Sequence, residues 1–583
     1  MTNDRTLEGG LDEPEELEPA PGSLAQAGPD DDWSVADWEA QAAAVLRKSR
    51  RLAEDDPDDR VWDALRRTTL DGIAITPLGT PALLESLATA GRPLRQGDWD
   101  IRALVAGDRP ALAHEEALAE LDGGATSLWV RVEDPADLPA VLDGVLLDLA
   151  PVVLQAPATP VAAAEAFLAY AAGRDLAPGT NLGVAGNADE ADLLAVVELA
   201  RRAGTLAVVV DATGVHDRGA SDGQELGHSM AVAARVLRVL TGAGIDLEEA
   251  ARLVEFRYAA TDDQVATIAK LRAARRLWAR VLELSDLQAD EPVAQRQHVV
   301  TSRPMMSKYD PWVNILRTTV AAFAAGVGGA DSVTVLPFDL PLGRPDAFGR
   351  RIARNTSHLL IDESHVAHVA DPAGGSYAVE KLTDDLAHAG WAVLGRIEDG
   401  DDLEVAVAAV AERREAEVAR RTRPITGLSE FPHLAERLPE RDTAGLEEAW
   451  AGVRRYGAAF EALRDDPAPA HVFLATLGPV ATHTARATFA TNLLAAGGVG
   501  VDVAGATAGT DDLVAAYDGQ PVVCLAGADG TYAEWGEAAA QALRGAGATH
   551  VVIAGRPVEW ADDSCATGVD ALDFLTRTRE KLA

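Results

Sequence analysis

Cysteine is scarce in this chain: Cys524 and Cys565 are the only two among 583 residues. Two cysteines cannot build the disulfide framework of a small secreted scaffold, which favours a reducing compartment. The chain also lacks an uncharged apolar run of about 18 residues, so we expect no segment to span a membrane. Residues 1–32 have neither the basic nor the apolar region of a secretory signal. We therefore expect a cytoplasmic protein.

Positive charge is also under-represented. The chain has 52 Lys and Arg residues against 92 Asp and Glu residues, and its formal net charge is -40. Nucleic-acid phosphates demand a basic surface, so this balance argues against a nucleic-acid partner. Most of the carboxylates are best explained as keeping the protein soluble. A polyanionic ligand would need a locally basic patch that acts against the overall field.

The N-terminal region is predicted to have two parts. Residues 1–32 are acidic and rich in Pro and Gly, which indicates a disordered arm. Residues 33–60 form a helical segment that opens with Trp33 and Trp38. Two tryptophans beside a polar tail are typical of an anchor, since each buries a large apolar area. The segment either packs across a partner subunit or packs back on its own chain.

Residues 61–400 alternate short β-type runs with helical stretches. After a preliminary strand at 72–75, eight strands are predicted, around 99–102, 127–130, 152–154, 181–184, 206–210, 254–257, 299–301 and 332–335. Helical segments separate most of them, as parallel strands joined by crossovers require. The pattern indicates an α/β fold of the (β/α)8 TIM barrel type, whose active sites lie at the carboxyl ends of the strands.

A second, smaller α/β domain is predicted after a charged helical linker at 401–468. Residues 469–583 contain strands at 472–476, 522–526 and 550–554, and helices at 485–496 and 533–543. This alternation is typical of a Rossmann-like or flavodoxin-like doubly wound domain. Ligands of such domains lie at the carboxyl ends of the strands.

The most distinctive stretch runs from residue 310 to residue 380. It contains Asp310-Pro311-Trp312, Asn314, Arg317, Leu336-Pro337-Phe338-Asp339, Arg350-Arg351-Ile352-Ala353-Arg354-Asn355-Thr356, Asp371-Pro372-Ala373-Gly374-Gly375 and Glu380. Polar residues so closely ordered must hydrogen-bond one another if they are buried. The stretch resembles the barrel domain of the methylmalonyl-CoA mutase family. Residues 469–583 are similar to that family's cobalamin-binding domain in both position and order.

The resemblance implies an adenosylcobalamin-dependent isomerase, but the cofactor motif is degenerate. In the family an Asp-x-His-x-x-Gly loop follows the first strand of the cobalamin domain, and its His ligates cobalt. Aligned on Gly478, the Asp, His and Gly become Val480, Thr482 and Ala485. His483 lies one residue late and lacks its orienting carboxylate. We interpret it as an ordinary loop histidine rather than a metal ligand.

Two further cofactor contacts of the family are replaced. Val523 takes the place of the Ser that faces the cofactor, and Ala554 takes the place of the first of two paired glycines. The resemblance therefore implies a degenerate cobalamin-binding-type domain. We expect no cofactor and no metal in this chain.

The barrel has also lost family residues. Leu104 stands nearest to the Tyr that packs beside substrate and cofactor in catalytic members. His216 survives at the position of the His that hydrogen-bonds the substrate thioester carbonyl, yet alone it is better explained as structural or vestigial. The motifs at 310–380 are interpreted as reporting fold and subunit contact. One face of the helix near 270–281 is expected to be core, with the members Leu271, Ala274, Leu277, Trp278 and Val281.

Within the family, these losses resemble the small, non-catalytic subunit of a heterodimeric mutase. Its catalytic large subunit would bind adenosylcobalamin and interconvert succinyl-CoA and (R)-methylmalonyl-CoA in propionate metabolism. Two alternatives remain open. One is a divergent active acyl-CoA mutase that uses His483 and His216. The other is a scaffold or regulatory protein built on an inactive mutase fold.

Overall fold

A computed structural model describes residues 33–85, 87, 91, 93, 95, 97–106, 109–289 and 292–583. The arm expected at 1–32 lies outside the described residues, as does Gly107. The chain divides into two compact units, Met1–Thr68 with Ala74–Leu78, and Thr69–Ile73 with Gly79–Ala583.

The N-terminal unit is a small helical assembly. Helix α1 (Val35–Lys48) begins at a capping box formed by Ser34 and Asp37, and α2 spans Val61–Leu65. Trp38 packs on Trp62, with ring centroids 4.7 Å apart. Strand β2 (Ala74–Ile75) pairs antiparallel with β1 (Arg67–Thr68). The preliminary strand expected at 72–75 therefore belongs to a two-stranded hairpin.

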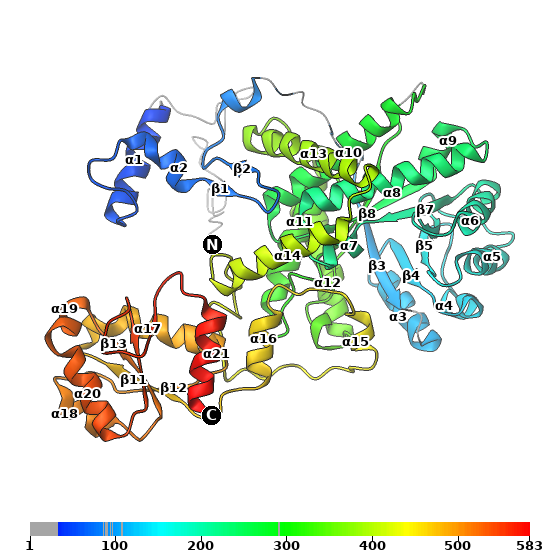
Figure 1. Cartoon of the computed structure of the whole chain (residues 1–583). Helices are drawn as coiled ribbons and strands as arrows, with labels where there is room; N and C mark the ends of the chain where they lie inside the picture. Colours follow the sequence, from blue (N-terminus) through cyan, green and yellow to red (C-terminus); the bar gives the residue numbers. More distant parts are fainter. Residues whose placement is uncertain are drawn as a thin grey trace, which may run out of the picture. The chain divides into compact units, whose positions relative to one another are not determined.

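The eight parallel strands predicted from the sequence form one closed barrel (Figure 1). They are β3 (Asp100–Ala106), β4 (Ser127–Arg131), β5 (Val152–Gln155), β6 (Asn181–Ala185), β7 (Leu206–Asp211), β8 (Val254–Ala260), β9 (Arg296–Thr301) and β10 (Ser332–Thr334). The last strand closes on the first through Ser332 opposite Asp100 and Val333 opposite Ile101. The predicted TIM barrel is confirmed.

Helices surround the barrel strands. They are α3 (Pro110–Asp122), α4 (Leu138–Val141), α5 (Pro160–Tyr170), α6 (Glu190–Ala203), α7 (Thr213–Asp217), α8 (Asp222–Gly242), α9 (Leu247–Arg252), α10 (Gln264–Leu284), α11 (Val313–Val327), α12 (Ala347–His358) and α13 (Tyr377–Glu398). The predicted core face of α10 is buried throughout, from Leu271 to Val281. Lys270 and Arg272 of the same helix are also fully buried, which the apolar pattern did not predict.

The polar residues at the start of the 310–380 stretch hydrogen-bond one another, as expected. The side-chain amide of Asn314 donates to the carbonyls of Ser307, at 2.8 Å, and Phe338, at 2.9 Å. Arg317 donates to the side-chain oxygen of Asn314 at 2.7 Å and to the Thr426 carbonyl at 2.6 Å. These side chains tie α11 to the segments on either side of it.

Two acidic residues at the end of the same stretch pair with a buried arginine. Arg272 of α10 pairs with Asp371 and, at 2.7 Å, with Glu380. Glu380 also accepts a hydrogen bond from the Gly375 amide at 3.0 Å. Gly375 has a φ of +81°, a conformation that favours glycine. The Asp-Pro…Gly-Gly motif thus shapes a turn that compensates a buried guanidinium.

Three helices lie between the barrel and the C-terminal sheet along the chain: α14 (Leu403–Ala419), α15 (Leu446–Ala449) and α16 (Ala458–Asp465). The C-terminal sheet has five parallel strands, β11 (Val472–Thr476), β12 (Val501–Val503), β13 (Val522–Ala526), β14 (His550–Ala554) and β15 (Asp563–Cys565). Their spatial order is β12-β11-β13-β14-β15. This is the 2-1-3-4-5 order of flavodoxin-like domains, so the structure selects that type over the Rossmann order.

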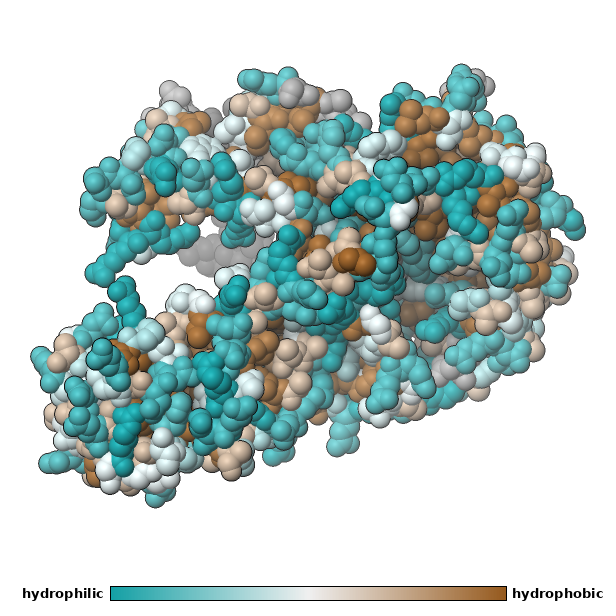
Figure 2. Space-filling view, viewed as in Figure 1, coloured by the Kyte–Doolittle hydropathy of each residue, from teal (hydrophilic) through white to brown (hydrophobic). Residues whose placement is uncertain are grey.

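The helices of this domain are α17 (Val480–Ala496), α18 (Thr510–Ala516), α19 (Asp529–Thr531), α20 (Glu537–Ala546) and α21 (Ala571–Leu582). Strands β12 and β15 were not predicted, since each is short and neither Val501–Val503 nor Asp563–Cys565 is a continuous apolar run. No helix in the described part of the chain is long and apolar enough to cross a membrane. Figure 2 shows mainly hydrophilic residues on the face that it presents, with smaller apolar areas between them.

Candidate functional site

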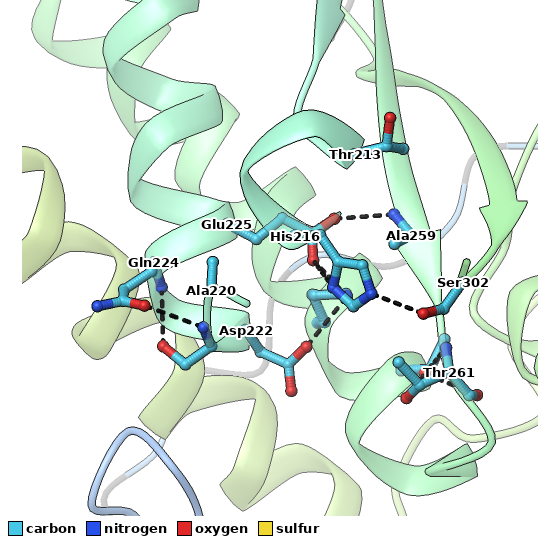
Figure 3. Close-up of polar contacts among 12 residues, drawn as sticks. Thr213, His216, Ala220, Asp222, Gln224, Glu225, Ala259, Thr261 and Ser302 are labelled. Carbon is cyan, nitrogen blue, oxygen red and sulfur yellow. Dashed lines mark hydrogen bonds and ion pairs between the residues drawn. The ribbon is translucent and has the colours of Figure 1, made fainter. Parts of the chain in front are cut away.

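His216 lies in α7, directly after the carboxyl end of β7. Its Nε2 atom is 2.7 Å from the hydroxyl of Ser302, which follows β9, and its Nδ1 atom is 3.6 Å from a Glu225 carboxylate oxygen. Figure 3 shows the ring between these two side chains. A carboxylate at Nδ1 favours the proton on that nitrogen, so Nε2 accepts from the Ser302 hydroxyl. The order Ser–His–acid matches that of hydrolytic triads.

Glu225 is held by several groups at once. It accepts from Lys270 Nζ at 2.7 Å and from the Ala259 amide at 2.8 Å, and Lys270 also lies 3.0 Å from Asp222. Burial acts to raise the pKa of Glu225, but the Lys270 charge and the His216 ring outweigh it and lower the pKa to about 2. Burial acts to lower the pKa of Lys270, yet the two carboxylates raise it overall. The carboxylate and the ammonium therefore both stay charged at neutral pH.

The triad-like cluster is closed to substrate. Ser302 is 1% exposed, His216 is 3% exposed and Glu225 is fully buried. The acceptor nitrogen of His216 is occupied by Ser302, so it is not free for a thioester carbonyl. The arrangement can hold a proton in place, but a reacting carbon cannot reach the Ser302 oxygen without movement of the surrounding chain. Sequence reasoning missed Ser302, although a polar residue directly after the strand at 299–301 was a usable signal.

The interior of the barrel is filled. Strands β4 and β8 stand opposite one another in the closed order. Nevertheless, the guanidinium carbon of Arg257 on β8 lies 3.9 Å from the centroid of the Trp129 ring on β4. Arg257 also donates to Asp211 at 2.7 Å and to His298 Nδ1 at 3.0 Å. The two side chains meet across the barrel axis and block it at this level.

A second layer of charge fills the barrel nearer the amino ends of its strands. Arg102 of β3 donates to Glu255 of β8 at 2.8 Å, and both side chains are completely buried. Arg296 lies 3.2 Å from the other oxygen of Glu255. Burial and three nearby arginines hold the pKa of His298 well below its usual range, so its ring is neutral. Glu255 and Arg257 alternate with Val254, Phe256 and Tyr258 along β8, but a pattern within one strand cannot show which side chains of other strands pair with them.

Leu104 lines a cavity of about 500 Å³ near the place where β10 and β3 meet. Arginines from α12 and the segment before it contribute to the lining, as do Glu116 and Glu120 of α3. Arg344 and Arg350 pair with Glu116, at 3.1 and 3.0 Å, and Arg354 pairs with Glu120 at 2.6 Å. The positive charge that a CoA phosphate would need is thus largely compensated within the chain.

The residues at the family's cobalt-ligand loop do not form a loop here. Helix α17 begins at Val480, five residues earlier than predicted. Val480, Thr482 and Ala485 are exposed on its first turns, whereas His483 is 6% exposed. His483 Nδ1 lies 3.1 Å from the Gly478 carbonyl oxygen. The expectation of a loop histidine was therefore wrong: His483 is a buried helical residue whose Nδ1 atom hydrogen-bonds the Gly478 carbonyl.

The carboxyl ends of β13 and β14 are also occupied. Val523 and Ala554 are both buried in the sheet core. The Tyr532 hydroxyl lies 2.9 Å from the Leu525 carbonyl and 3.0 Å from the Ala554 carbonyl, and it accepts from the Gly527 amide at 3.0 Å. Arg486 lies over the Tyr532 ring, 5.0 Å from its centroid. This region of the sheet is where a ligand of a doubly wound domain would bind.

The residues present do not fit cobalamin. A cobalt ligand needs an accessible imidazole oriented by a partner on its other nitrogen, and the corrin needs a bare backbone surface. His483 is buried, while Tyr532 and Arg486 fill the strand ends. No group of three or more His, Cys, Asp or Glu in the described residues could hold a metal ion. His216 and His483 lie in different domains, and each has a ring nitrogen satisfied within the chain.

Comparison with known proteins gives consistent matches. The family model described as methylmalonyl-CoA mutase matches residues 200–474. A methylmalonyl-CoA mutase small subunit of Streptomyces virginiae is 44% identical, over 94% of this chain and 96% of its own length. A probable small subunit of Mycobacterium bovis is 40% identical over 89% of this chain and 92% of its own. The small subunit of Propionibacterium freudenreichii subsp. shermanii is 34% identical over 96% of this chain and 97% of its own. The chain belongs to the methylmalonyl-CoA mutase family.

Proposed function

We propose that this chain is the non-catalytic small subunit of a heterodimeric, adenosylcobalamin-dependent methylmalonyl-CoA mutase. In this role it supports a large subunit that binds the cofactor and interconverts succinyl-CoA and (R)-methylmalonyl-CoA. The observation that carries the proposal is the contact of Arg257 with Trp129 across the barrel axis. A barrel whose opposite walls touch leaves no room at that level for a substrate.

The C-terminal domain supports the same proposal independently. The positions of the family's ligand loop fall on the first turns of a helix, and Tyr532 bridges the strand ends where a ligand would bind. Because the two domains are altered by different residues, one compensating substitution could not restore both. We propose domain boundaries of 61–400 for the barrel, 401–468 for the linker and 469–583 for the cobalamin-binding-type domain. The first of these overlaps the N-terminal compact unit at residues 61–68 and 74–78.

The test is to purify the chain alone and together with a candidate large subunit, and to measure corrin absorbance and turnover in both samples. We expect no corrin and no turnover from the chain alone, and one cobalamin for each large subunit in the complex. Corrin that copurifies with the lone chain would contradict the proposal. Absence of any stable complex would favour the scaffold alternative instead.

The divergent-mutase alternative has its own discriminating variant. His483→Ala in the assembled complex should leave the cobalamin content unchanged, because the ring is buried and bonded to Gly478. A cobalt-ligand role predicts loss of the cofactor. His216→Ala distinguishes a substrate acid from a structural residue in the same way, through kcat measured beside thermal stability.

A further inference from the structure

One outer face of the barrel is unusually apolar. Trp312, which precedes α11, is 51% exposed, and Leu316, one turn further on, is 65% exposed. The only charged residue of α11 is Arg317, and it is buried. Phe348 of α12 is 41% exposed, and it packs edge-on against Phe338, which in turn stacks on Trp312 at 4.8 Å. Contiguous apolar surface of this kind marks interaction sites on soluble proteins.

A strained loop extends this face. Phe431 is 70% exposed and has a φ of +55°, a conformation that is costly for a bulky residue. Nearby Leu434 is 42% exposed. The loop is anchored beside the start of α11, because Arg464 donates to the His433 carbonyl at 2.9 Å and the Asp310 amide donates to Glu436 at 2.8 Å. The chain therefore holds an aromatic side chain in solvent at a conformational cost that its own burial does not offset.

The apolar face has an arginine at its edge. Residues 312–361 contain five Arg and three Asp. Arg317 is buried, and Arg344, Arg350 and Arg354 pair with Glu116 and Glu120 of α3, so these four do not make the face positive. The Arg351 guanidinium carbon lies 5.6 Å from the Phe348 ring centroid. Arginine beside exposed aromatics is the composition of interface hot spots.

We propose that Trp312, Leu316, Phe348, Phe431 and Leu434 form the docking face for the large subunit. The inference rests on the proposed function, since the relatives that cover this chain are named small subunits and therefore have a different chain as partner. An apolar surface of the partner with acidic groups at its rim fits this face. Its aromatic residues supply the buried contacts, and Arg351 pairs with acidic groups at the rim.

The test uses the full chain, the large subunit and two substitutions. Leu316→Glu and Phe431→Ser should each weaken heterodimer formation on the order of 100-fold, measured by analytical ultracentrifugation over a concentration series. Both residues are largely exposed, so the thermal midpoint of the isolated chain should stay unchanged. Val405→Glu is the matched control, because Val405 is 68% exposed on α14, where its neighbour Glu404 pairs with Arg218 after β7. It should leave the affinity unchanged.

The outcomes separate this inference from the proposed function. If the wild-type chain forms no complex with the large subunit, the proposed function itself fails. If the wild-type complex forms and both substitutions leave its affinity unchanged, only the docking face is wrong. A lower thermal midpoint of the isolated Leu316→Glu chain would mean that the face is covered by the chain itself. Self-association of the wild type that Leu316→Glu abolishes would assign the face to a second copy, and either result overturns the proposal.

Discussion

The barrel and the C-terminal sheet domain bury polar groups very differently. The barrel buries a set of full charges, among them Arg102, Glu225, Glu255, Arg257 and Lys270. The buried polar side chains described in 472–583 are Thr476, His483, Thr507 and Thr578, around cores of aliphatic and aromatic residues. Both domains have features that oppose ligand binding, yet they differ in what holds them together. The barrel depends on mutually compensated charges, whereas the smaller domain depends on apolar packing.

Removing one member of a buried pair should have the largest effect. Lys270→Met leaves Glu225 buried without its cation, which should cost about 3–5 kcal/mol of unfolding free energy. Urea denaturation followed by circular dichroism measures the loss. Arg238→Met is the control in the barrel, because Arg238 pairs with Glu398 at the exposed surface and should cost less than about 1 kcal/mol. Equal losses of unfolding free energy in Lys270→Met and Arg238→Met would mean that buried charge pairs stabilise the barrel no more than exposed ones do.

A cavity in the C-terminal core should lower the free energy of unfolding nearly as much, but the loss should not depend on pH. Leu494 is 1% exposed within that core. Leu494→Ala should destabilise the domain by about 3 kcal/mol, through lost transfer energy and the cavity left behind. Hydrogen exchange of the amides in α17 and β13 reports the local loss. The loss should be the same at pH 7 and pH 4, and a pH-dependent loss would count against the contrast between the domains.

Low pH should reduce the stability of the barrel more than that of the C-terminal domain. The folded pKa of Glu225 is lowered from the ordinary 4.5 to about 2, so its contribution is fully present above pH 4.5 and is lost as the pH falls through about 2. The shift corresponds to about 3 kcal/mol. Most of this loss falls between pH 5 and pH 2.5, and it should be absent in Glu225→Gln, as measured by hydrogen exchange of α8 and α10. An unchanged pH profile would show that the pair does not control acid stability.

The smallest loss of unfolding free energy is expected from a substitution at Tyr532. Tyr532→Phe removes the hydroxyl that contacts the ends of β13 and β14, and should cost about 1–2 kcal/mol. Tyr170→Phe is the matched control in the barrel, because the Tyr170 hydroxyl makes one bond, to the Leu142 carbonyl at 2.7 Å. Neither variant should acquire corrin absorbance. Corrin binding by Tyr532→Phe would mean that this single hydroxyl blocks an otherwise competent site.

The sequence predicted the barrel strands well, because period-two runs and helical spacers are local signals. That Val480 to Ala485 stand where the family has its ligand loop stays a prediction. The sequence could not predict that these positions are helical, since the early start of α17 depends on packing against the sheet. Nor could it find the Arg257–Trp129 contact or the Ser302–His216–Glu225 cluster. Each of these joins residues far apart in the chain that only the closed barrel brings together.

The early start of α17 limits what protein engineering can recover. In a helix, residues two positions apart point to nearly opposite sides. An Asp introduced at 480 and a His introduced at 482 would therefore diverge, and the carboxylate could not orient the imidazole. Rebuilding a cobalt site in this chain would require the first turns of the helix to unwind. Transplanting a longer loop is therefore a better design route than point substitution.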